Sequence, residues 1–270
     1  MLFQSYIFIL LFFPLCLLGF WGLKRQKLLQ LWLIAFSLWF YGAASPYYLL
    51  LLLGSIAWNY AFFRAIERGI GRVIERVSGS AMERAEYGME RDSSRKRLLL
   101  GIGIAGNLAL LCFFKYFNAI SAGWSQMKGL EDPILQLALP LGISFFTFQQ
   151  IGFLADAYKG EVGACSLREY VLFVSFFPYV SSGPIVNAQE MLPQYRQIGR
   201  QRLDWAKFAG GLYLFALGLS KKVLLADTFG KAVDAGYGNV AGLSGTDAWL
   251  VMLFYTLQLY FDFSGYCDMG

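Results

Sequence analysis

The sequence contains no histidine among its 270 residues. Without imidazole, this stretch cannot by itself supply a Ser/His/Asp triad, a Cys/His pair or a histidine-ligated zinc site. Charge is also scarce, because 15% of the residues are charged and 57% are hydrophobic, whereas about a quarter of a soluble domain is charged. The four cysteines form no C-x-x-C pair, which argues against a metal site, a redox motif or a disulfide framework. The composition therefore indicates a protein of the lipid bilayer, with no metal.

Uninterrupted apolar runs predict six to eight membrane-spanning segments. The candidate runs are 2–22, 28–45, 47–63, 98–117, 134–155, 206–220 and 247–263. Most come close to the roughly 20 residues that a helix needs to cross a hydrocarbon core about 30 Å thick. The N-terminus lacks a basic region, so we expect the first run to remain as a span and not to be a cleaved signal peptide. The expected fold class is all-α, a polytopic transmembrane helical bundle.

The distribution of basic residues predicts the orientation and excludes one class of partner. Basic residues at 24–27 follow the first run, and residues 67–97 follow the third with eight basic and six acidic side chains. The positive-inside rule then places the N-terminus outside and 67–97 in the cytoplasm. Because this clustering is confined to a loop, the net charge of +5 does not indicate nucleic-acid binding.

The start of the 67–97 segment has helical periodicity. Ile66, Ile70, Val73 and Val77 recur at steps of four, three and four among arginine and glutamate. This pattern is typical of an amphipathic helix on the membrane surface, and equally of a solvated extension of the preceding span.

Two segments in the middle of the chain are too broken for lipid-facing helices. Residues 139–160 carry several polar side chains, and residues 170–186 are interrupted by Pro178, Gly183 and Pro184. Every backbone polar group must be satisfied in lipid, so such segments survive inside protein or beside a water-filled cavity. We expect re-entrant or buried elements around an interior chamber, with a packing kink as the alternative for each.

The sequence GIGIAG, at Gly101, Gly103 and Gly106, matches the letters of the dinucleotide fingerprint. That fingerprint works only between a strand and a helix, and here it opens an apolar run. Close helix packing is the better interpretation, with Gly101 and Ala105 on one face.

The end of the chain carries the clearest chemical signal. An apolar helix runs into FDFSGYCDMG, which places five polar side chains near membrane depth: Gln258, Asp262, Ser264, Tyr266 and Asp268. Ionisable residues in the bilayer are costly and mark functional sites by default. Three of these side chains would share one helix face at steps of four, unless Gly265 breaks the helix. The alternative is a helix end that emerges into water.

Four segments in order carry a resemblance to a known family. They are LPLGISFFTFQQIGFLADAYKG from Leu139, FFPYVSSGPIVNAQEMLPQ from Phe176, GLSKKVLLAD from Gly218 and YFDFSGYCDMG from Tyr260. Together they resemble the membrane-bound O-acyltransferase family, and most closely its bacterial alginate O-acetylation branch. The resemblance covers roughly the second half of the chain.

The resemblance implies a function in the inner membrane of a bacterium. Such an enzyme passes an acyl group from a cytoplasmic thioester donor, acetyl-CoA or an acyl carrier, to an extracytoplasmic hydroxyl. The expected acceptor is an alginate-like exopolysaccharide, reached through a partner acetyltransferase. The family's catalytic histidine would lie beyond Gly270, so we expect an N-terminal fragment that is inactive alone and holds no catalytic residue or bound cofactor.

The apolar runs, the charge pattern and the resemblance together predict a domain organisation. Residues 1–270 would form a single, incomplete membrane domain. Residues 1–66 supply the N-terminal spans, 67–97 the charged cytoplasmic loop, and 98–270 the family region, truncated at its C-terminal end.

Roles for polar residues follow from the chemistry of acyl transfer. An attacking hydroxyl needs a base, and neighbouring carboxylates can orient an imidazolium. Asp262 and Asp268 are therefore candidates to support the base, and Ser264 and Tyr266 to donate hydrogen bonds. The family's basic pair at 221–222 either lies near the donor at the cytoplasmic interface or anchors the helix by snorkelling.

Two other functions are compatible with the residues. Broken helices and intramembrane carboxylates also occur in transporters and flippases, although the two halves of the chain show no internal repeat. A non-catalytic membrane subunit that recruits a partner is the third hypothesis.

Overall fold

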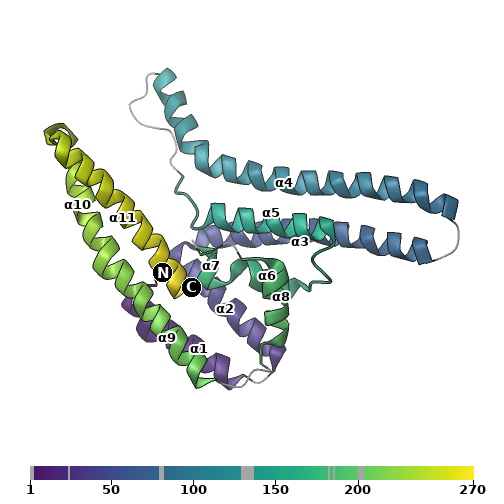
Figure 1. Ribbon diagram of the computed structural model, residues 1–270. Coiled ribbons are helices and arrows are strands. Elements are labelled where there is room, and N and C mark those ends of the chain that lie inside the picture. Colours follow the sequence, from purple (N-terminus) through teal and green to yellow (C-terminus); the bar gives the residue numbers. More distant parts are fainter. Residues whose placement is uncertain are drawn as a thin grey trace. The chain divides into compact units, whose positions relative to one another are not determined.

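A computed structural model provides the fold. It describes residues 3–23, 25–78, 82–128, 137–181, 183–184, 186–199 and 204–270, without the side chains of 69–93. Helices and connecting loops make up these ranges, with no strand among them, which confirms the all-α class (Figure 1). Four helices here are long and apolar enough to cross a membrane: Gln26–Ala44, Pro46–Arg68, Ser94–Met127 and Trp205–Gly238. The protein is a membrane protein.

The chain divides into two compact units, each described by itself. The α2–α8 unit comprises Leu23–Ser181 and Ile185–Arg200, and the terminal unit comprises Met1–Gly22, Ser182–Pro184 and Gln201–Gly270. Whether they form the single domain expected over 1–270 stays a prediction.

The α2–α8 unit begins with three long helices. α2 (Gln26–Ala44) ends at the uncharged turn that the sequence predicts, and α3 (Pro46–Ser78) and α4 (Met82–Met127) then lie side by side (Figure 1). Because α3 is unbroken to Ser78, the periodic segment after Ile66 extends the span and is not a separate surface helix. The side chains of Ile70, Val73 and Val77 lie outside the described residues.

An asparagine pair and two glycines join α3 to α4. Asn59 Nδ2 donates to Asn107 Oδ1 at 3.0 Å, and Asn107 Nδ2 donates to Asn59 Oδ1 at 2.6 Å. A Cβ at Gly103 would lie 2.9 Å from Leu154, and one at Gly106 would lie 2.9 Å from Trp58. Close packing in the GIGIAG segment is therefore confirmed.

The face predicted for that packing is wrong. A Cβ at Gly101 would have nothing within 4 Å, and Ala105 is exposed. Gly103 and Gly106 carry the contacts because they lie on the same side of the helix as the buried Asn107.

Helix α5 (Ile143–Lys159) is a buried element. The expected span 134–155 does not form as one helix, because α5 begins at Ile143 and residues 137–140 are irregular. A Cβ at Gly142, which has a φ of +67°, would collide with the carbonyl oxygen of Val180. Among the polar residues of α5, Gln150 donates to Ser55 Oγ at 2.9 Å and accepts from Tyr170 Oη at 3.2 Å. Its polar side chains thus face protein, as the sequence predicts.

The second broken segment consists of short helices. α6 (Leu167–Ser175) and α7 (Phe177–Val180) are separated at Phe176, and α8 (Ala188–Gln197) follows. Pro178 is buried near the start of α7, where a missing N–H costs nothing. Gly183 is buried and Pro184 exposed, and their neighbours Ser182 and Ile185 lie outside the described residues.

The terminal unit is built on one long helix. α9 (Trp205–Ser220), the π-helical turn η2 (Lys221–Ala226) and α10 (Asp227–Gly238) continue into one another, and α11 (Gly245–Met269) lies alongside (Figure 1). The short 3₁₀ turn η3 (Val240–Gly242) precedes α11. Near the N-terminus, η1 (Phe8–Phe12) and α1 (Phe13–Gly22) form a shorter apolar helix than the span expected over 2–22.

Candidate functional site

The site begins where two helices of the terminal unit touch through their backbones. A Cβ at Gly218 would lie 2.5 Å from the carbonyl oxygen of Gly265, and one at Gly265 would lie 2.7 Å from that of Gly218. Small residues at such a crossing let helices approach closely. Gly265 does not break α11, which is continuous to Met269. The contact brings the turn after α9 against the C-terminal end of α11.

One turn beyond this crossing, Lys221 binds two side chains of α11. Its Nζ lies 2.6 Å from Asp268 Oδ2 and donates to Ser264 Oγ at 3.0 Å. Ser264 and Asp268 are four residues apart, so both side chains lie on one face of α11. The side chains of Lys221 and Asp268 are about a quarter exposed, 26% and 25%.

The next residue, Lys222, joins two carboxylates. Its Nζ lies 2.7 Å from Asp262 Oδ1 and 2.9 Å from Asp227 Oδ1. Two ammonium groups thus face three carboxylates, and we name these five residues and Ser264 the lysine–aspartate cluster. Asp262 is its most accessible acid, with 51% of its side chain exposed.

The cluster lies in the middle of its helix. Lys221 and Lys222 are the two central residues of the 34-residue helix Trp205–Gly238, about 25 Å from either end at 1.5 Å per residue. Both lie in the π-helical turn η2, a geometry frequent at functional sites. These contacts favour an ion-paired role for the lysines over snorkelling anchors, because each ammonium group binds a carboxylate of α11.

The five predicted C-terminal residues divide into two groups. Asp262, Ser264 and Asp268 meet in the cluster, whereas Gln258 packs on Gly230 and Tyr266 stacks edge-on against Phe3 at 5.1 Å. Gln258, Asp262 and Tyr266, which were expected on one polar face at steps of four, therefore contact different neighbours. The side-chain oxygen Oε1 of Gln258 is buried without a hydrogen bond among the described residues.

Sequence reasoning missed the pairing itself and the participation of Asp227. The KK dipeptide and an acid five residues later were visible, but the ion-pair partners of the two lysines on α11 lie 40 or more residues further along the chain. Pro178, Gly183 and Pro184 are not members of the cluster, and their role as a re-entrant segment stays a prediction.

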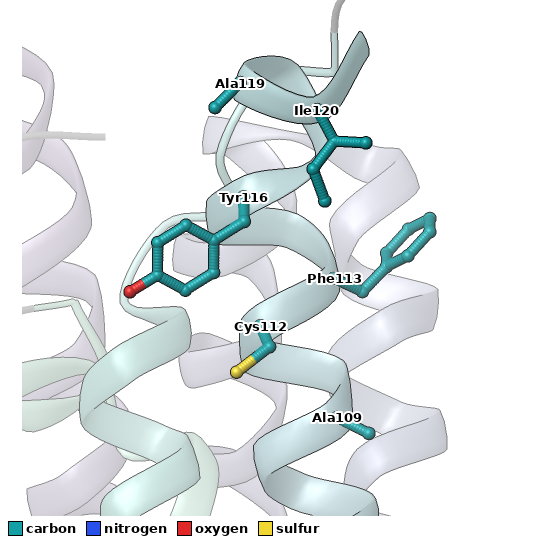
Figure 2. Close-up of a pocket in the computed structure, with 6 residues that line it drawn as sticks. All are labelled: Ala109, Cys112, Phe113, Tyr116, Ala119 and Ile120. Carbon is teal, nitrogen blue, oxygen red and sulfur yellow. The ribbon is translucent and has the colours of Figure 1, made fainter. Parts of the chain in front are cut away.

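A different kind of hollow lies on the outer face of α4. Its lining residues, which Figure 2 shows as sticks along one helix, are Ala109, Cys112, Phe113, Tyr116, Ala119 and Ile120. A single helix provides all of them, and most of the lining is apolar, so lipid chains can fill this depression without any specific chemistry. Within the described ranges, no three cysteine, aspartate or glutamate side chains are grouped to hold a metal ion.

Fold and site define a class: a polytopic helical membrane protein with an ion-paired cluster halfway along one of its long helices. No family model matches the sequence. The chain is 36% identical to the peptidoglycan O-acetyltransferase of Helicobacter pylori, with 100% of this chain and 53% of that protein covered. It is also 36% identical to a probable alginate O-acetylase of Pseudomonas putida, with 100% of this chain and 52% of that protein covered.

A more distant relative is the teichoic acid D-alanyltransferase of Lacticaseibacillus rhamnosus, 28% identical over 47% of this chain and 33% of that protein. The chain spans about half the length of the O-acetyltransferases it matches. These matches over the whole chain confirm the predicted resemblance. The chain is homologous to the alginate O-acetylase and peptidoglycan O-acetyltransferase branch of the membrane-bound O-acyltransferases.

Proposed function

We propose that this chain forms part of a membrane-bound O-acyltransferase that O-acetylates a bacterial exopolysaccharide, with an alginate-like polymer as the acceptor. The observation that carries the proposal is homology along the whole chain to proteins named as O-acetyltransferases. The charged cluster halfway along a long apolar helix supports it, because ionisable residues within membrane-spanning helices mark functional sites.

In this proposal the cluster orients the groups that react. Acyl transfer to an alcohol needs a base that removes the hydroxyl proton, and a nearby carboxylate can orient and stabilise an imidazolium. Asp262 suits this role because it is half exposed and shares Lys222 with Asp227. The chain has no histidine, so such a base would come from the remainder of the enzyme.

The proposal includes a direction across the membrane. The donor is an acyl thioester on the cytoplasmic side, and the acyl group leaves to a hydroxyl or a partner acetyltransferase on the other side. The protein resides in the bacterial inner membrane with its N-terminus outside, because basic residues at 24–27 and between 67 and 97 would then be cytoplasmic.

Asp262→Asn in the complete enzyme tests this role. We expect the O-acetyl content of the polysaccharide to fall at least tenfold, on the order of 1.4 kcal/mol in transition-state stabilisation, with the amount of protein in the membrane unchanged. Asp234→Asn is the matched control, because Asp234 is an exposed acid of α10 with no ion pair among the described residues. Equal acetylation by the two variants would show that Asp262 is a solvated residue with no part in the reaction.

A further inference from the structure

The last turns of α4 extend past the start of the neighbouring helix. Near the beginning of α3, the ring of Tyr48 lies 6.1 Å from that of Phe114 on α4. From Phe114, α4 continues to Met127, about 20 Å of helix at 1.5 Å per residue. Residues 119–128, which we name the α4 end, therefore lie beyond the first turn of α3.

The α4 end begins where the hydrocarbon core of the membrane ends. The apolar run 98–117 follows the basic residues 95–97 and comes to about 30 Å as a helix, which is the thickness of that core. The next residue, Asn118, binds the backbone of Leu137, because its Nδ2 donates to Leu137 O at 2.7 Å and its Oδ1 accepts from Leu137 N at 2.8 Å. The residues that follow Asn118 thus lie outside the core, opposite the charged segment 67–97.

The α4 end exposes its apolar side chains and buries a polar one. Ile120, Trp124 and Met127 recur at steps of four and three on one helix face, and they are 69%, 56% and 84% exposed. Ser125 is only 2% exposed. A helix at a water-facing surface shows the opposite arrangement, with its polar side chains outward. The outward face of the α4 end is therefore suited to an apolar environment.

The course of α4 brings this face toward lipid. Near its C-terminal end the helix bends, and its last turns leave the line that the rest of α4 follows beside α3 (Figure 1). A straight helix would carry Trp124 and Met127 out of the membrane into water. A bend at the boundary instead turns the last turns toward the membrane plane.

A lysine and a tryptophan lie together at the α4 end. The Nζ atom of Lys128 lies 5.3 Å from the centroid of the Trp124 ring. Tryptophan is enriched at membrane interfaces, where its amphipathic ring lies at the level of the headgroups. A lysine beside it can extend its ammonium group toward lipid phosphates.

We propose that the α4 end is an amphipathic anchor that lies in the membrane plane and binds the phospholipid interface. Ile120, Trp124 and Met127 enter the boundary between headgroups and acyl chains, and Lys128 pairs with headgroup phosphates. This inference rests on the membrane fold and is independent of the proposed function.

Spin labels in the complete enzyme test the depth of the α4 end. Ile120→Cys, Trp124→Cys and Met127→Cys are labelled one at a time in an enzyme free of native cysteines, in nanodiscs of phosphatidylethanolamine and phosphatidylglycerol. Power-saturation EPR then compares collisions with oxygen, which concentrates in lipid, and with a water-soluble nickel chelate. We expect the three labels to lie within about 3 Å of one depth. A helix that continued along the membrane normal would separate the first label from the last by about 10 Å at 1.5 Å per residue.

Gln126→Cys is the matched control, because Gln126 is an exposed polar residue on another face of the same turn. We expect its label to collide with the nickel chelate about fivefold more often than the label at position 124. Equal collision rates at the two positions would contradict an apolar face directed into lipid.

Photolabelling of the native enzyme needs no substitution, so it remains informative if the cysteine-free enzyme does not fold. A lipid-soluble diazirine should form adducts at Trp124 or Met127 within about threefold of those at Phe113, which is 51% exposed inside the apolar run. Adducts at Phe113 alone would overturn the proposal. Labels at 120, 124 and 127 that reach the nickel chelate freely would place the face in water, and labels that reach neither reagent would show that protein covers it. Either result would also overturn the proposal.

Discussion

The two units of the protein each contain a polar cluster, and the clusters differ in charge and burial. In the α2–α8 unit, Asn59, Asn107 and Gln150 are neutral, at most 2% exposed, and hydrogen-bonded to one another or to their neighbours. In the terminal unit, Lys221 and Lys222 are about a quarter exposed and face one more carboxylate than there are ammonium groups.

The difference separates a structural role from a functional one. A neutral network whose members satisfy each other stabilises one helix register and leaves nothing for a ligand to bind. A charged cluster with an accessible, surplus carboxylate costs stability and keeps binding capacity. We therefore expect substitutions to affect mainly folding in the first cluster and mainly activity in the second.

The largest effect on stability is expected at the helix crossing that supports the charged cluster. Gly265→Leu places side-chain atoms against the backbone of Gly218, which cannot move aside as a flexible side chain would. We expect a loss of about 3 kcal/mol, the upper range for overpacking, and separation of the lysines from their carboxylates. Thermal unfolding in detergent measures this loss. Gly210→Leu is the control, since a Cβ at Gly210 of α9 meets nothing within 4 Å. Equal destabilisation by the two variants would contradict the close contact between Gly218 and Gly265.

The neutral cluster is expected to show the next largest effect. Asn107→Leu leaves the amide of Asn59 buried with part of its hydrogen bonding lost, which costs about 2 kcal/mol. The double variant Asn59→Leu/Asn107→Leu should recover about 1 kcal/mol of that loss, because no unpaired partner remains. Chemical unfolding of the four proteins in this cycle gives the coupling energy. Additive losses would show that the pair does not act as a unit.

Measurements of activity test the same difference between the neutral and the charged cluster. The asparagine variants that still fold should retain O-acetyl transfer within about threefold in the complete enzyme, since a lost structural contact lowers the amount of folded protein and not the chemistry of each molecule. A tenfold loss at unchanged protein level would place the asparagine pair in the functional site instead.

The sequence was sufficient for much of the fold and for most members of the site, but not for Asp227. Apolar runs and the Ser45-Pro46 turn located the long helices, and polarity within 139–160 identified a buried element. It could not decide whether the helix continues past Ile66, because an amphipathic pattern has the same period in a surface helix and in an extension of a span.

Pairing within the site depends on tertiary structure. Which face of α11 meets α9 is determined by the Gly218–Gly265 crossing, and helical periodicity cannot select among faces that all carry polar residues. Periodicity also could not identify the packed face of the GIGIAG segment, because small residues lie on more than one side of that helix. Only the side that carries the buried Asn107 packs against neighbouring residues, and Gly101 lies outside it.

Neutralising one ion pair of the charged cluster should change the free energy of unfolding less than Gly265→Leu or Asn107→Leu does. Asp268→Asn leaves Lys221 with Ser264 as its polar partner, and we expect a loss of about 1 kcal/mol, because a pair that is a quarter exposed is partly solvated. Lys221→Met/Asp268→Asn removes both charges and should restore most of that stability. Thermal unfolding of Asp268→Asn, Lys221→Met and the double variant measures these changes. A loss in the double variant as large as the sum of the losses in the two single variants would show that the charges do not interact.

The smallest effect is expected for a charge pair without a surplus carboxylate, at the surface of the α2–α8 unit. Burial acts to raise the pKa of Glu169, but hydrogen bonds from Arg196 at 2.9 Å and from Ser166 outweigh it, so the pKa lies below its ordinary value of 4.5. A lowered folded-state pKa stabilises the protein above the ordinary value, and this stabilisation is lost as the pH falls through the lowered one. Because 43% of the Arg196 side chain is exposed, we expect only about 0.5 kcal/mol. Glu169→Gln should therefore be less stable than the native protein at neutral pH, and the difference should shrink as the pH falls below 4.5, as thermal unfolding along a pH series would show. A difference that persists in acid would mean that Glu169 stabilises α6 through its cap geometry and not through its charge.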